Sequence, residues 1–171
     1  MIQEKYTINS EETSLNLVQT QIESVRKKNI TKTGFRVYKD EKIGVSGAIG
    51  RYDEQEQWEK AEKALSLNIA YPFEVSKNLE KSVEKTCDFA DGLAFSREME
   101  EMLKVLREKH PQFIFSNKIN LVTDTVTLEN DKGLNLHSKI SKIEASILIK
   151  EKSSPDLMDA FMGMEGTRWD R

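Results

Sequence analysis

The fold of this chain is decided by the stretch Thr33-Gly34-Phe35-Arg36-Val37-Tyr38-Lys39-Asp40-Glu41-Lys42-Ile43-Gly44. Phe35 and Val37 alternate with polar or amphipathic neighbours, and Ile43 and Val45 resume the alternation after the polar residues 39–42. A period of two is typical of half-buried strands, and a short polar run between two such strands is typical of a turn. We therefore predict an antiparallel hairpin here.

The same period extends outward from the hairpin in both directions. Leu15 and Leu17 precede it on an expected strand, and residues 112–150 return to alternation after two helical segments. The clearest strand pattern places Ile143, Ala145, Ile147 and Ile149 on one face. The run Asn130-Asp131-Lys132-Gly133 predicts a turn between two of these strands.

A first helix is expected to begin after Asp53, an N-cap residue with Glu56 three residues later, as in a capping box. Its apolar face would consist of Trp58, Ala61, Leu65 and Ile69. Proline cannot continue a helix, so we expect it to end before Pro72. We also expect Trp58 to share one core with Phe35 and Val37.

A second helix is expected to begin at the cap Ser96 and to end before Pro111. Its apolar stripe would consist of Met99, Met102, Leu103 and Leu106. Residues 72–95 show no clear period and predict a loop-rich connection, with Asp91-Gly92 as a turn.

These elements predict an α+β fold with antiparallel sheet and two main helices, in the order strands, helix, helix, strands. We expect one α+β domain over residues 1–154 and an incomplete linker or tail over 155–171. Pro155 suits the first position of a further helix, and the chain stops inside what reads as a continuing segment.

Composition limits the function classes. The chain has 171 residues, 26 basic and 29 acidic residues and a net charge of −3. Its charges are interspersed, so it lacks the basic face that nucleic acid requires. The N-terminus has no signal-peptide core, no stretch is long and apolar enough to span a membrane, and Cys87 is the single cysteine. We expect a cytoplasmic protein that contacts neither nucleic acid nor membrane directly.

The residues that could carry chemistry are few. His110 and His137 are 27 residues apart and Cys87 has no histidine near it in sequence, so no zinc-ligand spacing or activated thiol is evident. The glycine-rich run Gly44–Gly50 lacks the Lys-Ser/Thr pair of a phosphate loop and favours a glycine-bent edge strand. We expect no catalytic, cofactor-binding or metal-binding residue in this chain.

The hairpin and first helix nonetheless resemble a known family. In the TldD/PmbA proteins, also called modulators of DNA gyrase, a G-x-R-V-x-x-D-x-x-x-G hairpin precedes a helix of the form A-x-x-A-L. The matching residues here are Gly34, Arg36, Val37, Asp40, Gly44, Ala61, Ala64 and Leu65. The turn at Asn130–Gly133 resembles the family's N-S-x-G turn, but has Asp131 where serine is usual.

The resemblance implies the N-terminal domain of a metallopeptidase-like protein of two domains, active on extended peptides. Catalytic members carry zinc on a His-Glu-x-x-x-His helix, and the PmbA-like members lack this motif and pair with a TldD-like subunit. The motif is absent here. The resemblance therefore implies a non-catalytic part that binds an extended peptide, a TldD/PmbA-like partner subunit or a second copy, in peptide maturation or proteolysis. A stand-alone gyrase or toxin modulator and an unrelated structural α+β domain stay open.

Overall fold

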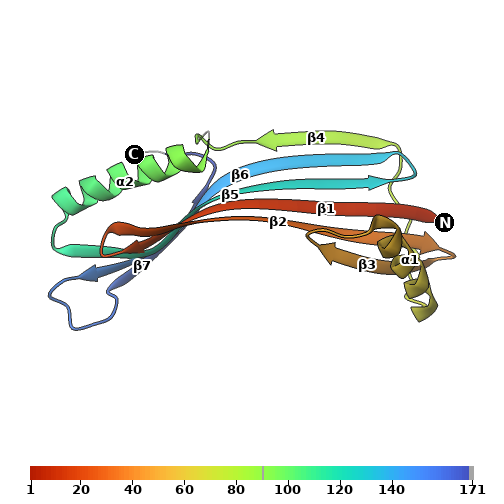
Figure 1. The fold of residues 1–171 in the computed structure, drawn as a ribbon, viewed down its shortest axis with the longest axis horizontal. Helices are drawn as coiled ribbons and strands as arrows, with labels where there is room; N and C mark the ends of the chain where they lie inside the picture. The colour runs from red at the N-terminus through yellow and green to blue at the C-terminus, as the bar shows by residue number, and fades with distance from the viewer. Residues whose placement is uncertain (90, 170–171) are drawn as a thin grey trace. The chain divides into compact units, whose positions relative to one another are not determined.

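The computed structural model describes residues 1–89 and 91–169 and has the expected α+β class (Figure 1). The strands are β1 (Ile2–Val18), β2 (Gln21–Lys39), β3 (Lys42–Ile49), β4 (Leu79–Lys85), β5 (Phe113–Asn130), β6 (Leu134–Glu151) and β7 (Ala160–Gly166). The helices are α1 (Glu54–Ala64), which runs into the 3-10 turn η1 (Leu65–Leu67), and α2 (Gly92–Lys109). The described strands form one antiparallel sheet in the order β3-β2-β1-β5-β6-β4, with β7 paired to β6.

Contacts divide the chain into two compact units, which are described separately. Unit 1 consists of Met1–Ser10, Asn29–Glu84 and Asp124–Lys139. Unit 2 consists of Glu11–Lys28, Lys85–Thr123 and Ile140–Arg171. The long strands β1, β2, β5 and β6 each contribute residues to both units.

Unit 1 has a small core between α1 and the β2–β3 hairpin. Phe35, Val37 and Ala61 are fully buried there, and Trp58 packs against them. The rings of Phe35 and Trp58 meet edge to face, with centroids 4.8 Å apart and planes at 84°. This confirms the expectation that Phe35, Val37 and Trp58 belong to one core.

Two local features allow α1 to lie against this hairpin. Lys39 pairs with Lys42, and the two residues between them, Asp40 and Glu41, have positive φ angles of 50° and 56°, so the turn has the expected minimal length. Gly44 faces α1 at very short range: a Cβ there would lie 2.0 Å from the carbonyl oxygen of Ala61. Helix and strand can approach this closely only because residue 44 has no side chain.

Unit 2 has the larger core, between α2 and one face of the sheet. Phe95, Met99 and Leu103 of α2 are fully buried. They pack against Leu15, Leu17, Ile119, Leu121, Ile143, Ala145 and Ile147 from β1, β5 and β6. The expected alternation of Ile143, Ala145 and Ile147 is confirmed, because all three are buried on the face that α2 covers.

The start of α1 confirms a prediction, and the start of α2 corrects one. Asp53 caps α1 as expected, accepting a 2.9 Å hydrogen bond from the backbone N–H of Glu56. The cap of α2 is Asp91 and not Ser96, since the Asp91 carboxylate accepts from Leu93 N–H and Ala94 N–H at 2.8 Å each. The turn expected at Asp91-Gly92 is a helix start instead. Gly92 opens α2 at close range to β1, because a Cβ there would lie 2.5 Å from Thr13 Oγ1.

The first helix also ends earlier than predicted. It stops at Ala64, and Asn68 then adopts a left-handed conformation with φ of 54°. The chain next runs beside the hairpin: Ile43 N–H donates to Ile69 O at 3.0 Å, and Tyr71 N–H donates to Glu41 O at 2.6 Å. Ile69 is therefore in an extended segment and half exposed, not on the apolar face of α1.

Two strands are not predicted by the sequence pattern. β4 lies within residues 72–95. Inside this strand only Leu79 and Val83 are apolar, and charged residues obscure the period. β7 lies within residues 155–171, so the helix expected from Ser154-Pro155 is wrong. In its place β7 pairs with β6 from Ile149↔Ala160 to Ile143↔Gly166. Across the described residues 1–89 and 91–169, neither helix has the length and apolar character needed to cross a membrane.

Candidate functional site

The residues with potential chemistry do not converge. His110 is the exposed C-cap of α2, Cys87 is buried in the core of unit 2, and His137 is a half-buried residue of β6 in unit 1. Among residues 1–89 and 91–169, no three His, Cys, Asp or Glu side chains are grouped so that they could hold a metal ion. Within the run Gly44–Gly50, residues 44–49 belong to β3, the strand at one end of the sheet order, and Gly50 follows that strand. Gly44 packs on α1.

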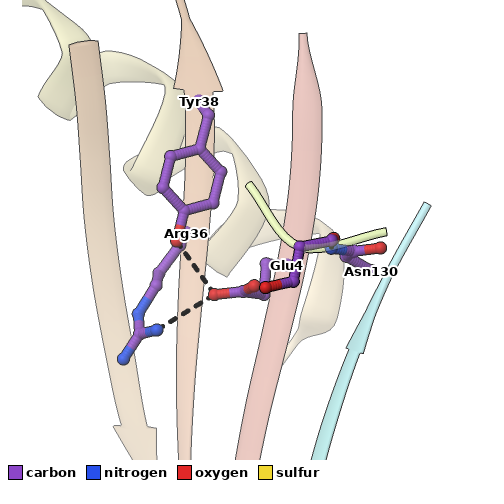
Figure 2. Close-up of polar contacts among 5 residues, drawn as sticks. Glu4, Arg36, Tyr38 and Asn130 are labelled. Carbon is purple, nitrogen blue, oxygen red and sulfur yellow. Dashed lines mark hydrogen bonds and ion pairs between the residues drawn. The ribbon is translucent and has the colours of Figure 1, made fainter. Parts of the chain in front are cut away.

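A buried polar cluster lies on the face of unit 1 opposite α1 (Figure 2). Glu4 of β1 is only 5% exposed, and its Oε1 accepts hydrogen bonds from Arg36 Nη1 and Tyr38 Oη of β2, each 2.9 Å long. Figure 2 shows Arg36 and Tyr38 converging on this one carboxylate oxygen, with Asn130 of β5 on the far side of Glu4. The alternation of the strands places this trio on one face, whereas Phe35 and Val37 point to the other.

The segment between η1 and β4 crosses this end of unit 1 and closes over the cluster. The Tyr71 ring packs on the Tyr38 ring, with centroids 4.9 Å apart. Asn130 Nδ2 donates to the carbonyl oxygen of Ser76 at 2.8 Å, and Asn78 N–H donates to Lys132 O at 2.9 Å. These contacts restrict the access of water to Glu4 and Tyr38.

The electrostatics of the cluster follow from this burial. Burial, together with the hydrogen bond to Glu4, raises the pKa of Tyr38 to about 12. Burial alone would lower the pKa of Arg36, but its hydrogen bonds to Glu4 and Tyr38 outweigh this and raise it. Tyr38 therefore stays a neutral donor and Arg36 a cation, and their hydrogen bonds to Glu4 make the trio a structural clamp between β1 and β2.

Two surface hollows add no reactive centre. One, of about 290 Å³, is lined in unit 1 by Gln3, Lys5, Glu54, Trp58, Glu129, Asn130 and Asp131. Its lysine is already paired, since Lys5 Nζ lies 2.8 Å from Glu54 Oε2. The other, of about 430 Å³, is lined in unit 2 by Gln19, Thr20, Arg107, Pro111, Phe113, Ile114 and Lys152. Arg107 there donates to the Thr20 carbonyl and to Glu100.

The edges of the sheet are the more informative surfaces. Edge strands expose unpaired N–H and C=O groups, and proteins commonly protect them with charged residues. β4 has four charged residues, Glu80, Lys81, Glu84 and Lys85, and the part of β2 that precedes its pairing with β3 has the run Arg26-Lys27-Lys28. β7 has the sequence Ala-Phe-Met-Gly-Met-Glu-Gly, in which Glu165 is the single charge. By this criterion β7 is an unprotected edge.

β7 has apolar side chains on both of its faces. Met162 stands opposite Ile147 and Met164 opposite Ala145, so both methionines prolong the face that α2 covers. Phe161 stands opposite Leu148 on the other face. Exposed fractions are 58% for Phe161 and 46% for each methionine. An unprotected edge with apolar side chains on both faces can accept an added strand.

The loop that leads into β7 holds the strand in place and adds apolar surface. The ammonium of Lys150 donates to the backbone carbonyls of Ser154 and Asp156, and the carboxylate of Asp159 accepts from Glu151 N–H and the Ser154 hydroxyl. Leu157, at the tip of this loop, is 98% exposed. We call the surface formed by Leu157, Phe161, Met162 and Met164 the β7 edge.

Sequence reasoning finds neither the clamp formed by Glu4, Arg36 and Tyr38 nor the strand geometry of the β7 edge. The signal for the clamp is present in part, because Arg36 and Tyr38 lie two residues apart in the predicted strand. Its acceptor, Glu4, lies at the start of a strand that is not expected to begin so early. The residues of the β7 edge are recognisably apolar in the sequence, but the pattern does not indicate their strand geometry.

Comparison with known proteins shows which fold this chain has. The sequence matches no protein-family model and no curated protein. The structure is similar to TldE from Thermococcus kodakarensis, with a TM-score of 0.74 and 16% identity over 99% of this chain and 40% of that one. It is also similar to two proteins described as candidate modulators of DNA gyrase. The Thermotoga maritima protein gives a TM-score of 0.68 and 15% identity, over 96% of this chain and 38% of that one. The Bacteroides thetaiotaomicron protein gives a TM-score of 0.68 and 13% identity, over 98% of this chain and 41% of that one.

These similarities show the fold. The expected resemblance is confirmed at that level, because nearly the whole chain superposes and not the hairpin alone. The chain spans about two fifths of the length of the structures it matches.

Proposed function

Since the chain has the fold of the TldD/PmbA proteins, we propose that it is a non-catalytic part of such a protein that binds an extended polypeptide at the β7 edge. The polypeptide is a peptide or a segment of a partner subunit, and the setting is cytoplasmic peptide maturation or proteolysis. The observation that carries the proposal is the open strand β7, with Phe161, Met162 and Met164 exposed beside it.

The physical basis is strand addition. A polypeptide in extended conformation can pair with the free N–H and C=O groups of β7, and main-chain hydrogen bonds then supply affinity without requiring a particular sequence. Methionine is flexible and polarisable, so Met162 and Met164 can adapt to different side chains. A site of this kind suits a protein that handles unfolded peptides.

Hydrogen–deuterium exchange of the full chain tests the proposal. The probe is reduced, carboxymethylated lactalbumin, an unfolded polypeptide, added in excess to dilute protein. We expect slower amide exchange over residues 160–166 and no change over residues 79–85 of β4, whose edge is charged. Unchanged exchange over 160–166 at saturating probe contradicts the proposal.

A matched pair of variants distinguishes binding at the β7 edge from non-specific apolar contact. Met164→Lys places a charge on the open strand and is expected to abolish the protection, since lysine at an edge opposes pairing. Val45→Lys makes the same change at a half-exposed position of β3 and is expected to preserve the protection. Equal loss in both variants would show that the probe binds through non-specific apolar contact.

A second function, a stand-alone gyrase modulator, is supported by the descriptions of the Thermotoga and Bacteroides proteins. A supercoiling assay with purified gyrase distinguishes it. A dose-dependent change in supercoiling rate caused by this chain alone would favour the modulator, and no effect together with protection of β7 favours the peptide-binding role.

A further inference from the structure

We infer that the polypeptide which occupies the β7 edge is β7 of a second copy of this chain, in antiparallel register about Gly163. This inference rests on the proposed function, because it names the partner of the same edge. Its basis is the order of residues in β7, which is complementary to itself when two copies run in opposite directions.

The register follows from placing Gly163 opposite Gly163. Met162 then stands opposite Met164 of the second copy, and Phe161 stands opposite Glu165 of the second copy. A two-fold axis makes both halves of such an interface identical. All seven residues of β7, Ala160–Gly166, find a partner in this register.

The side chains favour this arrangement on the α2 side of the sheet. Met162 and Met164 stand beside the buried Ile147 and Ala145, yet each is nearly half exposed. Pairing across the axis places the two methionines of one copy against those of the other. The apolar face of unit 2 then continues from one copy to the next, and burial of this surface stabilises the pair.

The opposite face of β7 is also compatible with this register. Phe161 leans over its own Gly163, since a Cβ at residue 163 would lie 3.6 Å from the ring atom Cε1. The two glycines at the axis leave room for two such rings. Glu165 faces a phenylalanine across the axis and not another glutamate, and it is already paired with Lys142 at 3.2 Å.

Neighbouring registers are less favourable. A shift that centres the axis on Glu165 brings two glutamates directly opposite each other, and like charges in that position are destabilising. A shift that centres it on Phe161 pairs Gly163 with Asp159, which lies in the loop before β7. Among the registers with the axis on residue 161, 163 or 165, the charge and length of β7 therefore favour Gly163.

Charge substitutions at Gly163 test both the partner and the register. The site tolerates a side chain in the monomer, because the Phe161 ring is the one described neighbour within 4 Å of a Cβ added at residue 163. In the dimer, Gly163→Lys places two lysines opposite each other, and Gly163→Glu places two glutamates opposite each other. We expect each variant alone to lose the dimer and an equimolar mixture to regain it.

Sedimentation equilibrium of the full chain over a range of concentrations provides the measurement. The wild-type chain should show a concentration-dependent shift from the 19.7 kDa monomer to twice that mass. Gly163→Lys and Gly163→Glu should remain monomeric, their mixture should dimerise, and Val45→Lys should behave as the wild type. Circular dichroism verifies that the variants are folded.

Each result decides the matter. A wild-type chain that stays monomeric, a Gly163→Lys chain that still dimerises, or a mixture that stays monomeric overturns the inference. If the wild type is monomeric while carboxymethylated lactalbumin still protects residues 160–166, the second-copy inference fails and the proposed function stands. If the Gly163-centred dimer forms and the lactalbumin probe never protects these residues, peptide binding fails and self-association stands.

Discussion

The phenol of Tyr38 donates a 2.9 Å hydrogen bond to the carboxylate of Glu4, and both side chains are buried in unit 1. A buried carboxylate needs partners, and this one obtains them from two residues of the neighbouring strand. The pair therefore links the first residues of β1 to the end of β2, next to the hairpin that defines the fold.

Tyr38 should make stability fall at alkaline pH. In the unfolded chain a tyrosine ionises near pH 10, whereas in the folded chain the pKa of Tyr38 is raised to about 12. The stabilising contribution is present below pH 10 and is lost as the pH rises from there through about 12, because the unfolded state releases its proton first. Urea unfolding at a series of alkaline pH values should show this decline in the wild type and a shallower one in Tyr38→Phe. An identical decline in both proteins would assign it to other groups.

Glu4→Ala should destabilise the chain at neutral pH. The change leaves the buried Tyr38 hydroxyl without its acceptor, and an unsatisfied buried donor costs about 1–3 kcal/mol. Arg36 is partly exposed, so water can replace its lost partner. Urea unfolding measures the loss, and Glu62→Ala on the exposed face of α1 is the control, with an expected change within about 0.5 kcal/mol. Equal losses of stability in Glu4→Ala and Glu62→Ala would indicate that the clamp contributes nothing to the stability of the fold.

Gly44→Ala should displace α1 from the hairpin. The added methyl would overlap the Ala61 carbonyl and approach Leu65 N to 2.9 Å. Overpacking of this kind typically costs about 1–3 kcal/mol. Gly34→Ala is the matched control on the adjacent strand, because its Cβ would meet nothing closer than Tyr6 O at 4.0 Å. The urea midpoint, followed by tryptophan fluorescence, should fall for Gly44→Ala and hold for Gly34→Ala.

Asp91→Ala should weaken the start of α2, whereas Ser96→Ala should not. Hydrogen bonds from Ala94 N–H and Leu93 N–H lower the pKa of Asp91. A lowered pKa contributes stability that is present above the unfolded value near 3.8 and is lost as the pH falls through the folded value. Thermal unfolding should therefore give a lower Tm for Asp91→Ala at neutral pH, and the difference from wild type should shrink in acid. A lower Tm for Ser96→Ala alone would favour Ser96 as the cap.

The chain should bind no stoichiometric zinc. His110 and His137 belong to different units, and no metal-competent group of side chains is found among residues 1–89 and 91–169. Inductively coupled plasma analysis of the purified chain should find well below one zinc per chain. About one zinc per chain, lost in His110→Ala or His137→Ala, would contradict this prediction.

The sequence predicts the features that depend on local spacing. The turn at residues 39–42, the cap Asp53 and the shared core of Phe35, Val37 and Trp58 all follow from periods of two or of three and four, and all are present. The strand conformation of the β7 edge escapes prediction because an exposed edge strand buries neither face and so shows no alternation. Its methionines also suit helices, and Pro155 resembles a helix start.

The length of β1 escapes prediction for a related reason. Residues 5–10 are all half-buried, so their side chains carry no contrast between an inner and an outer face. The partner of Glu4 cannot be deduced either, since Arg36 lies 32 residues away and the pairing depends on the register of two long strands. Contacts set by long-range register leave little trace in the local pattern.

The place of β1 between β2 and β5 also has a consequence for biosynthesis. The Ser14 hydroxyl donates to Asn120, which is 106 residues further along the chain. At a translation rate of roughly 5–20 residues per second, Ser14 of β1 is synthesised about 5–20 s before this partner. During that interval the β1–β2 hairpin presents an unpaired edge to the surrounding solution. The nascent chain is therefore a candidate client for ribosome-associated chaperones, and the sheet closes only once β5 has been synthesised.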